Sequence, residues 1–168
     1  MPSHTTPDWT REAVERGAYE PGKKLLAAIR LYQKWAHRGI LGRAQQKRAV
    51  LLHRFWSAVC ASDIPLETEI EGGLILPHPL GIVIHPASRI GPNCVIFQGV
   101  TLGATKGKDG LPVIEGGVVI GAGAKILGAV RVGHHARVGA NAVVTKDVPP
   151  LGIAVGVPAR SVVRASPL

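Results

Sequence analysis

Histidine is the residue type in this sequence best suited to proton transfer at neutral pH, because its side chain gains and loses a proton near that pH. His78 stands in a turn flanked by prolines, where it is either a general base or simply a turn residue. His85 follows seven residues later, and His134 and His135 are adjacent in a later turn. For these three histidines, a direct role and an outward-facing turn position both remain open.

The two cysteines, Cys60 and Cys94, match no metal-site or redox spacing and are too few for a disulfide framework. We therefore expect reduced thiols, no bound metal and a cytoplasmic protein. The polar, charged start of the chain does not resemble a signal peptide, and no apolar run approaches the roughly 18 residues that span a bilayer.

The elements that position these side chains follow from a repeat of six residues. Aliphatic residues recur with this spacing at Ile64, Ile70, Leu76, Ile84, Ile90, Ile96, Leu102, Ile114, Ile120, Ile126, Val132, Val138 and Val144. Six residues make one short strand and one tight turn, three such units close a triangular coil, and stacked coils pair about 4.8 Å apart by parallel hydrogen bonds. The pattern predicts a parallel β-helix with an aliphatic core, since aromatic residues are only 4% of the chain.

Two irregularities interrupt the repeat. Eight residues instead of six separate Leu76 from Ile84, which shifts the register by two. Twelve separate Leu102 from Ile114, and the polar, glycine-rich stretch between them is expected to loop out of the coil. Functional groups tend to be added where a repeat is interrupted, and the first interruption contains His78.

Residues 1–61 show a different pattern, an irregular start followed by a basic helical region. Apolar spacings of three and four predict two helices after Pro21, the second from Ala44 to Val59 beyond an interruption by two glycines. We expect their apolar stripes to pack on the rest of the protein.

Charge is concentrated in the same region. Residues 1–60 contain eleven Lys/Arg and four Asp/Glu, a net charge of +7, whereas residues 61–168 have a net charge of +2. This charge is either a solvated helical face or a weak contact for an anionic membrane or an acidic partner. Nucleic acid is not expected, because no recognised binding motif accompanies the charge.

From Asp63 to Val163 the sequence resembles the serine O-acetyltransferases of the hexapeptide acyltransferase superfamily. The matching segments are SDIPLETEIEGGLILPHPLGIVI, QGVTLGAT, IGAGAKILGAVRVG and VPPLGIAVGVPAR. The resemblance implies acetyl-CoA as co-substrate, a left-handed coil and a homotrimer with active sites between subunits. It divides the chain, mainly β in class, into a basic α-helical region, residues 1–61, and a left-handed parallel β-helix acetyltransferase domain, residues 62–168.

The family's catalytic histidine and its partner aspartate correspond to His78 and Asp63. Fifteen residues are a little less than one coil, so the two would lie on adjacent rungs. Asp63 would accept a hydrogen bond from one ring nitrogen, and the other nitrogen would take a proton from the acceptor hydroxyl as its oxygen attacks the acetyl-CoA thioester. Backbone N–H groups would stabilise the resulting oxyanion.

The family binds CoA through backbone groups of small residues along the edge of the coil, and basic side chains are candidates for its phosphates. The corresponding positions are Ala104, Thr105, Ala122 and Ala140, with Lys125 and Arg160 as the basic candidates. Small residues at these four positions would also be expected from packing at the corners of the coil alone. The two basic residues would equally be expected as solvated surface charges.

Two departures from the family concern the acceptor. Pro77 replaces the aspartate that precedes the catalytic histidine in serine-specific members, and Gly110 and Leu111 replace an Arg-His pair in the loop. Those charged groups hold the ammonium and carboxylate of serine. The resemblance therefore implies transfer to a hydroxyl of a small acceptor, either serine or a sugar or polysaccharide precursor.

Two functions of other kinds remain open. A non-catalytic β-helix scaffold would keep the repeat without the chemistry. A γ-type zinc carbonic anhydrase would need three converging histidines, and no histidine triplet here has that family's spacing.

Overall fold

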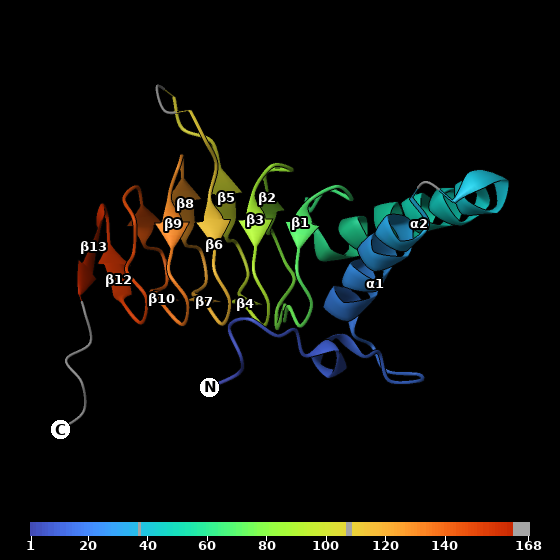
Figure 1. The fold of residues 1–168 in the computed structure, drawn as a ribbon, viewed down its shortest axis with the longest axis horizontal. Helices are drawn as coiled ribbons and strands as arrows, with labels where there is room; N and C mark the ends of the chain where they lie inside the picture. Colours follow the sequence, from blue (N-terminus) through green and yellow to red (C-terminus); the bar gives the residue numbers. More distant parts are fainter. Residues whose placement is uncertain (37, 107–108, 163–168) are drawn as a thin grey trace.

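A computed structural model describes residues 1–36, 38–106 and 109–162 and contains a β-helix with two helices at one end (Figure 1). The helical elements are the short 3-10 helix η1 (Trp9–Glu12), α1 (Pro21–Lys34) and α2 (Gly39–Cys60). The strands are β1 (Glu69–Ile70), β2 (Val83–Ile84), β3 (Arg89–Ile90), β4 (Val95–Ile96), β5 (Thr101–Gly103), β6 (Val113–Ile114), β7 (Val119–Ile120), β8 (Lys125–Leu127), β9 (Arg131–Val132), β10 (Arg137–Val138), β11 (Val143–Val144), β12 (Ile153–Gly156) and β13 (Ala159–Val162).

The strands form three sheets, one for each face of a triangular coil. The β1 face has the order β1-β3-β6-β9, the β2 face β2-β5-β8-β11, and the β4 face β4-β7-β10-β12, all parallel. The last strand, β13, pairs antiparallel with β12. From β1 to β12, consecutive strands belong to different faces, so the chain turns three times per coil, as the repeat predicts.

Two series of turns matter for the function. We call the turns that lead from the β4 face to the β2 face, residues 77–82, 97–100, 121–124 and 139–142, the His78 corner. The turns from the β1 face to the β4 face, residues 71–74, 91–94, 115–118 and 133–136, are the Asn93 corner.

The aliphatic residue of each repeat points into one continuous core. Across the β2 face, Ile84 pairs with Leu102 and Leu102 with Ile126, so identical positions stack from coil to coil. All thirteen aliphatic residues of the predicted repeat are at most 8% exposed. The six-residue period therefore predicted the core correctly.

The two interruptions also lie where the sequence places them. A regular coil takes eighteen residues, from Ile84 to Leu102. The coil from Ile70 to Ile90 takes twenty, and its two extra residues are in the turn that carries His78. The loop between β5 and β6 projects from the β-helix (Figure 1), with residues 107–108 outside the described part.

The two helices differ in how much of their surface they bury. Leu25, Leu26 and Ile29 of α1 are buried in one cluster with Ile64 and Leu76, so α1 closes the open end of the first coil. Within α2, which is described in full, the buried residues are a glycine, an alanine and a cysteine. No helix in the described ranges is both long and apolar enough to cross a bilayer.

Two expectations about α2 are wrong. The helix begins at Gly39 rather than Ala44, because Gly42 packs against the carbonyl oxygen of Trp35, where an added Cβ would lie 2.8 Å away. Its apolar stripe does not pack on the rest of the protein, since Leu51 is 67% exposed and Phe55 is 58% exposed.

The irregular start of the chain lies along the Asn93 corner. The Asn93 carboxamide donates to the carbonyl oxygens of Ser3 (2.7 Å) and Thr6 (2.8 Å) and accepts from the N–H of Asp8 (2.8 Å). One carboxylate oxygen of Glu12 accepts two further backbone N–H bonds from this corner, at 2.8 and 3.1 Å. We call the segment from Ser3 to Glu12 the N-terminal strap.

Candidate active site

His78 lies in the longest turn of the His78 corner. Its carbonyl oxygen accepts a hydrogen bond from the N–H of Leu80 at 2.8 Å, and Gly81, with φ +65°, completes the turn in a conformation that favours glycine. The imidazole is exposed and makes no hydrogen bond, ion pair or ring contact with any residue that the structure describes. The turn therefore presents a free histidine ring to solvent.

Asp63 lies on the neighbouring rung. Its N–H donates to the carbonyl oxygen of Ile82 and its own carbonyl oxygen accepts from the N–H of Ile84, both at 2.8 Å. The carboxylate is exposed. These backbone hydrogen bonds place Asp63 beside Ile82 and Ile84, a few residues after His78.

The buried hydroxyl of Ser62 fixes this arrangement. It donates to the carbonyl oxygen of Pro79 (2.8 Å) and accepts from the N–H of Ile82 (3.0 Å). The sequence interpretation missed this contact, and its one signal is a serine directly before Asp63. No hydrogen bond joins the side chains of Asp63 and His78 within the described structure.

Two of the predicted CoA-binding positions, Ala122 and Ala140, lie in the same corner as His78. This corner is a ladder of backbone hydrogen bonds, in which Gly99, Gly123 and Asn141 each donate an N–H to the preceding coil at 2.8 Å. Its last two turns consist of glycine and alanine with Asn141, so this part of the corner forms a narrow ledge of peptide groups, whereas Phe97 and Gln98 occupy the turn next to His78.

The other predicted positions divide between the two edges of the β2 face. Lys125, on β8, donates its ammonium to the carbonyl oxygen of Gly99 at 2.5 Å, which ties this cation to the His78 corner. Ala104 and Thr105 begin the projecting loop at the opposite edge. Arg160 is exposed on β13, paired with Val155 at the far end of the β-helix, so the structure does not bring it to the others.

The remaining histidines of the β-helix lie elsewhere. The Nδ1 atom of His85 accepts from the N–H of Ala87 at 3.2 Å, a contact within its own turn. His134 and His135 are in the Asn93 corner, where the ring of His134 stacks on that of His4 with 4.4 Å between centroids. The ring of His4 also meets that of His135 edge-on, at 5.2 Å.

This ring cluster has an electrostatic consequence. Burial, followed by the neighbouring His4 and His134 side chains, lowers the pKa of His135. Burial acts to raise the pKa of Glu115, but hydrogen bonds from Arg131 and His134 outweigh it and leave that pKa below its usual value. These groups are partners of one another and belong to the N-terminal strap, the Asn93 corner and the β1 face rather than to the His78 corner.

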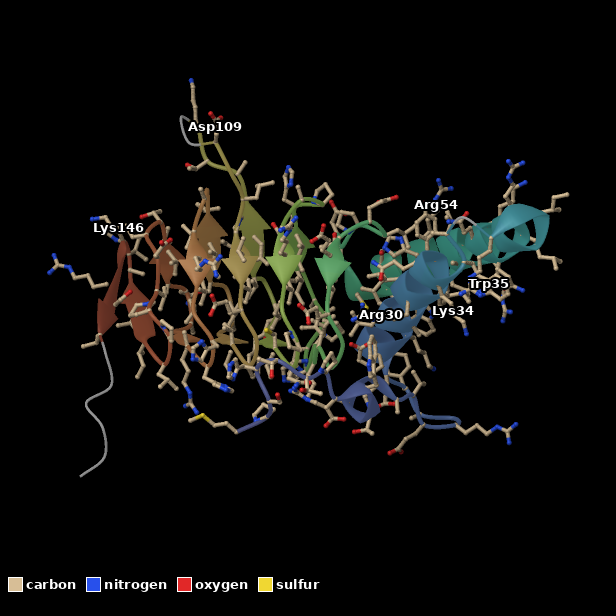
Figure 2. The ribbon with its side chains drawn as sticks, in the orientation of Figure 1. Arg30, Lys34, Trp35, Arg54, Asp109 and Lys146 are labelled. Atoms are coloured by element: carbon tan, nitrogen blue, oxygen red, sulfur yellow. The ribbon has the colours of Figure 1, made fainter. Side chains whose placement is uncertain are left out.

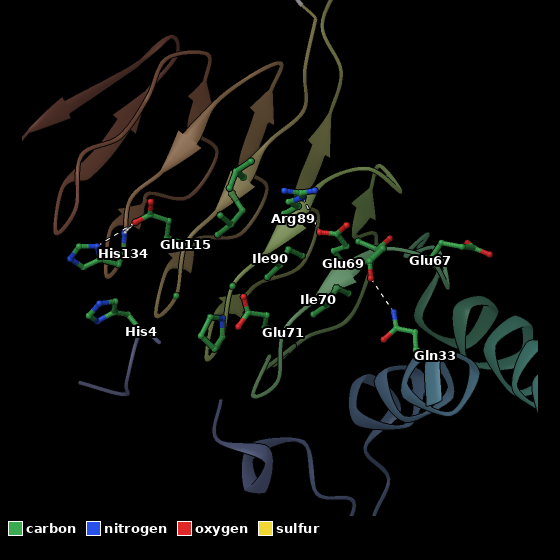
Figure 3. Close-up of a pocket in the computed structure, with 16 residues that line it drawn as sticks. His4, Gln33, Glu67, Glu69, Ile70, Glu71, Arg89, Ile90, Glu115 and His134 are labelled. Atoms are coloured by element: carbon green, nitrogen blue, oxygen red, sulfur yellow. Dashed lines mark hydrogen bonds and ion pairs between the residues drawn. The ribbon is translucent and has the colours of Figure 1, made fainter. Parts of the chain in front are cut away.

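A cavity of about 700 Å³ lies on the β1 face (Figure 3). Its charged lining consists of Glu67, Glu69, Glu71, Arg89, Glu115 and the two histidines His4 and His134. None of the predicted catalytic or CoA-binding residues lines it. This larger hollow is therefore separate from the chemistry expected at the His78 corner.

A smaller cavity of about 240 Å³ is lined by Pro77 and Pro79, the sequence neighbours of His78, but not by His78 itself. Its other wall comes from the N-terminal region and includes Arg11, Glu20 and Lys23. Glu20 and Lys23 form an ion pair of 2.6 Å. One guanidinium nitrogen of Arg11 is buried and has no hydrogen-bond partner among the described residues.

The described residues contain no group of three or more His, Cys, Asp or Glu side chains arranged to hold a metal ion. The three-histidine cluster is packed ring against ring and so does not converge on a point. Both cysteines are free and buried, and burial raises the pKa of the Cys94 thiol to about 12.

Comparison with known proteins places these features in a family. Residues 112–146 match the family model described as bacterial transferase hexapeptide (six repeats). The chain is 37% identical over 139 residues to the serine acetyltransferase of Mycobacterium tuberculosis, an alignment that covers 79% of this chain and 60% of that protein. It is 45% identical over 116 residues to the serine acetyltransferase of Escherichia coli, covering 68% of this chain and 42% of that protein.

Solved structures show the same relationship. A serine acetyltransferase in complex with CoA matches with a TM-score of 0.72 at 38% identity, over 86% of this chain and 58% of that one. A soybean serine acetyltransferase complexed with serine matches with a TM-score of 0.73 at 38% identity, over the same shares. Since 86% of the chain exceeds residues 62–168, the similarity includes part of the helical region, which the sequence motifs do not cover.

The fold is thus the predicted left-handed parallel β-helix with a short N-terminal α-helical region, and the chain is a member of the hexapeptide-repeat superfamily. Within that superfamily it is a serine acetyltransferase-like protein. The matches span 39%, 60% and 64% of the length of the first three curated relatives.

Proposed function

We propose that the protein is an acetyl-CoA-dependent O-acetyltransferase that acetylates the hydroxyl of a small acceptor, with serine as the preferred acceptor. The observation that carries the proposal is the free imidazole of His78, which stands at the end of a ledge of small residues. Similarity to serine acetyltransferases, one of them in complex with CoA, supports the choice of donor.

In this mechanism His78 is the general base. One ring nitrogen takes the proton of the acceptor hydroxyl while the hydroxyl oxygen forms a bond to the thioester carbon. As the carbon–sulfur bond breaks, the imidazolium returns that proton to the leaving thiolate, so no other reactant is needed. Asp63 accepts the hydrogen bond from the second ring nitrogen once substrates are bound, since such contacts often tighten only in the complex.

The ledge beside His78 suits the extended arm of CoA. Ala122 and Ala140 have small side chains, and an added Cβ at Gly99 would lie 3.5 Å from the Cα of Gly123, so successive coils are in close contact along this corner. Lys125 is held near this ledge by Gly99, which favours it over the distant Arg160 as a partner of a CoA phosphate.

The smaller cavity supports serine as the acceptor. The sequence lacks the charged pair that holds the amino acid in serine-specific relatives. Arg11 is among the residues that line this cavity with Pro77 and Pro79, and a guanidinium is a suitable hydrogen-bond partner for a carboxylate. A carboxylate is present in serine and absent from a neutral sugar.

We also propose that the protein is a cytoplasmic homotrimer with its active sites between subunits. Leu80 and Val83, close to His78, are 55% and 42% exposed in the single chain, and a subunit contact would cover them. Light scattering should give a mass of three 17.7 kDa chains, about 53 kDa. A monomer would contradict this part of the proposal.

Release of CoA thiol from acetyl-CoA tests the activity directly. We expect release with L-serine to exceed release with sugars or with water alone. Arg11→Ala should raise KM for serine with little change in KM for acetyl-CoA, and Arg16→Ala, an exposed arginine of the same region, is the matched control. Absence of release with every acceptor would favour a scaffold, and zinc-dependent hydration of carbon dioxide would favour a carbonic anhydrase.

A further inference from the structure

The outer side of α2 carries an apolar surface that none of the described residues covers. Ile40 and Leu41 are 85% and 77% exposed, and Leu51, Leu52 and Phe55 follow on the same side. With about 100° of rotation per residue, these five side chains fall within a sector of about 120°, opposite the buried side of the helix. An exposed apolar stripe of this size usually marks a contact surface.

Basic side chains border this stripe. Arg43, Lys47 and Arg54 fall in a narrow sector directly beside it, and Arg48 lies within it. None of these four makes an ion pair with the described residues. We call the five apolar and four basic residues together the α2 outer face.

The charge of the whole helical region has one sign. From residue 21 to residue 60 the sequence contains nine Lys/Arg and no Asp/Glu. Figure 1 shows α1 and α2 extending away from the first coil, and Figure 2 shows the side chains of Lys34, Trp35 and Arg54 on this projection. Near the end of the helical pair, the Arg38 guanidinium lies over the ring of Trp35, 5.6 Å from its centroid.

We propose that the α2 outer face docks on an anionic lipid surface. Apolar side chains flanked by long cationic ones are the pattern of a helix that lies in a membrane interface. The cations would meet lipid phosphates while Leu51 and Phe55 enter the boundary of the acyl chains. A tryptophan and two exposed aliphatic residues near the end of the helical pair fit the same interfacial environment.

Charge argues against direct pairing of the α2 outer faces of two copies of this chain. Pairing two outer faces would bring together two regions that each lack any acidic residue, and the repulsion would have no internal compensation. An anionic surface supplies the missing charge. This docking does not depend on the proposed transferase activity, since it is a property of binding alone.

Co-sedimentation of the full chain with lipid vesicles tests the proposal. We expect binding to vesicles of phosphatidylcholine mixed with phosphatidylglycerol and much weaker binding to phosphatidylcholine alone. Raising salt from about 0.1 M to 1 M, which shortens the Debye length from about 10 Å to 3 Å, should reduce binding. Lys47→Ala should weaken it about fivefold, because a cation near such a surface contributes about that factor.

A second variant separates docking from general electrostatic attraction. Leu51→Glu combined with Phe55→Glu should lower binding at least tenfold, while Leu151→Glu, an exposed leucine in the turn before β12, should not change it. Absence of vesicle binding, or binding that the double variant leaves unchanged, would overturn the proposal. So would a fall in oligomeric mass in the double variant, which would assign the α2 outer face to a contact between copies.

Discussion

The Asn93 corner and the His78 corner are built from the same six-residue repeat, but the N-terminal strap covers the first, whereas the second is open beyond its first turn, where Gly22 approaches Pro79. The N-terminal strap lies on the first, where Gly116 approaches the His4 carbonyl so closely that an added Cβ would be 2.0 Å from its oxygen. The second has mostly glycine and alanine in its last two turns, and His78 in its first turn has no described partner. A histidine whose ring is already used in packing has a structural role, whereas an unused ring remains available for chemistry.

The largest effect should come from changing the catalytic corner. Asp63→Asn should reduce turnover by about 10²–10⁴-fold, because the imidazolium loses its charged partner. Thermal stability should stay near that of the wild type, since the carboxylate is exposed and forms no described contact. Thiol release and a melting curve measure both, with Glu67→Gln, another exposed carboxylate, as control. A loss no greater than that of the control would remove Asp63 from the mechanism.

The next largest effect is expected on stability, at the Asn93 corner. Asn93→Ala should destabilise the protein by about 2–4 kcal/mol, because three backbone groups of the strap lose their partner. Asn141→Ala is a matched control, since Asn141 has nearly the same φ, 56° against 59°, in the open corner and holds no strap. Urea unfolding measures the difference, and equal losses for the two variants would mean that the strap contributes nothing to stability.

Substitution of one glycine in each corner is a further test of the difference between the two corners. Gly116→Ala should displace the strap and cost about 1–3 kcal/mol by overpacking. Gly99→Ala has room for its methyl group but a φ of +68°, so it should cost about 1 kcal/mol and leave the strap in place. Limited proteolysis of the N-terminus distinguishes them, and equal cleavage rates would contradict the assigned positions.

The smallest effect is a pH dependence of stability. Since the folded pKa of His135 is lowered, the unfolded state binds more protons in the range below about pH 6.5, and stability should fall there as pH decreases. Above that range the side chain is neutral in both states and the effect disappears. Melting temperatures of wild type and His135→Asn across this range measure it, and parallel curves would show that the cluster does not titrate as described.

The repeat is what made the fold predictable from sequence. Each coil buries one aliphatic side chain per face, so burial of Ile84, Leu102 and Ile126 follows from local spacing alone. The extra residues around His78 also appear as a change of spacing. When strands pair at a fixed sequence interval, the local spacing of residues predicts the long-range contacts.

The N-terminal region had no such signal. The contacts of Asn93 with Ser3 and Thr6 join residues about ninety positions apart, and nothing periodic marks either end. Gly42 was expected to interrupt a helix. It lies within α2 instead, and glycine is needed there because an added Cβ would lie 2.8 Å from the carbonyl oxygen of Trp35. The packing of His134 and the buried nitrogen of Arg11 depend on the same long-range placement.

Replacement of one histidine from each corner tests the central claim most directly. Thiol release from acetyl-CoA with L-serine is compared for wild type, His78→Ala and His134→Ala, with binding of CoA measured in parallel. We predict that His78→Ala loses about 10²–10⁴-fold in turnover and still binds CoA, while His134→Ala retains the wild-type rate. Equal turnover in His78→Ala and wild type, or a comparable loss in His134→Ala, would contradict the assignment of chemistry to the open corner.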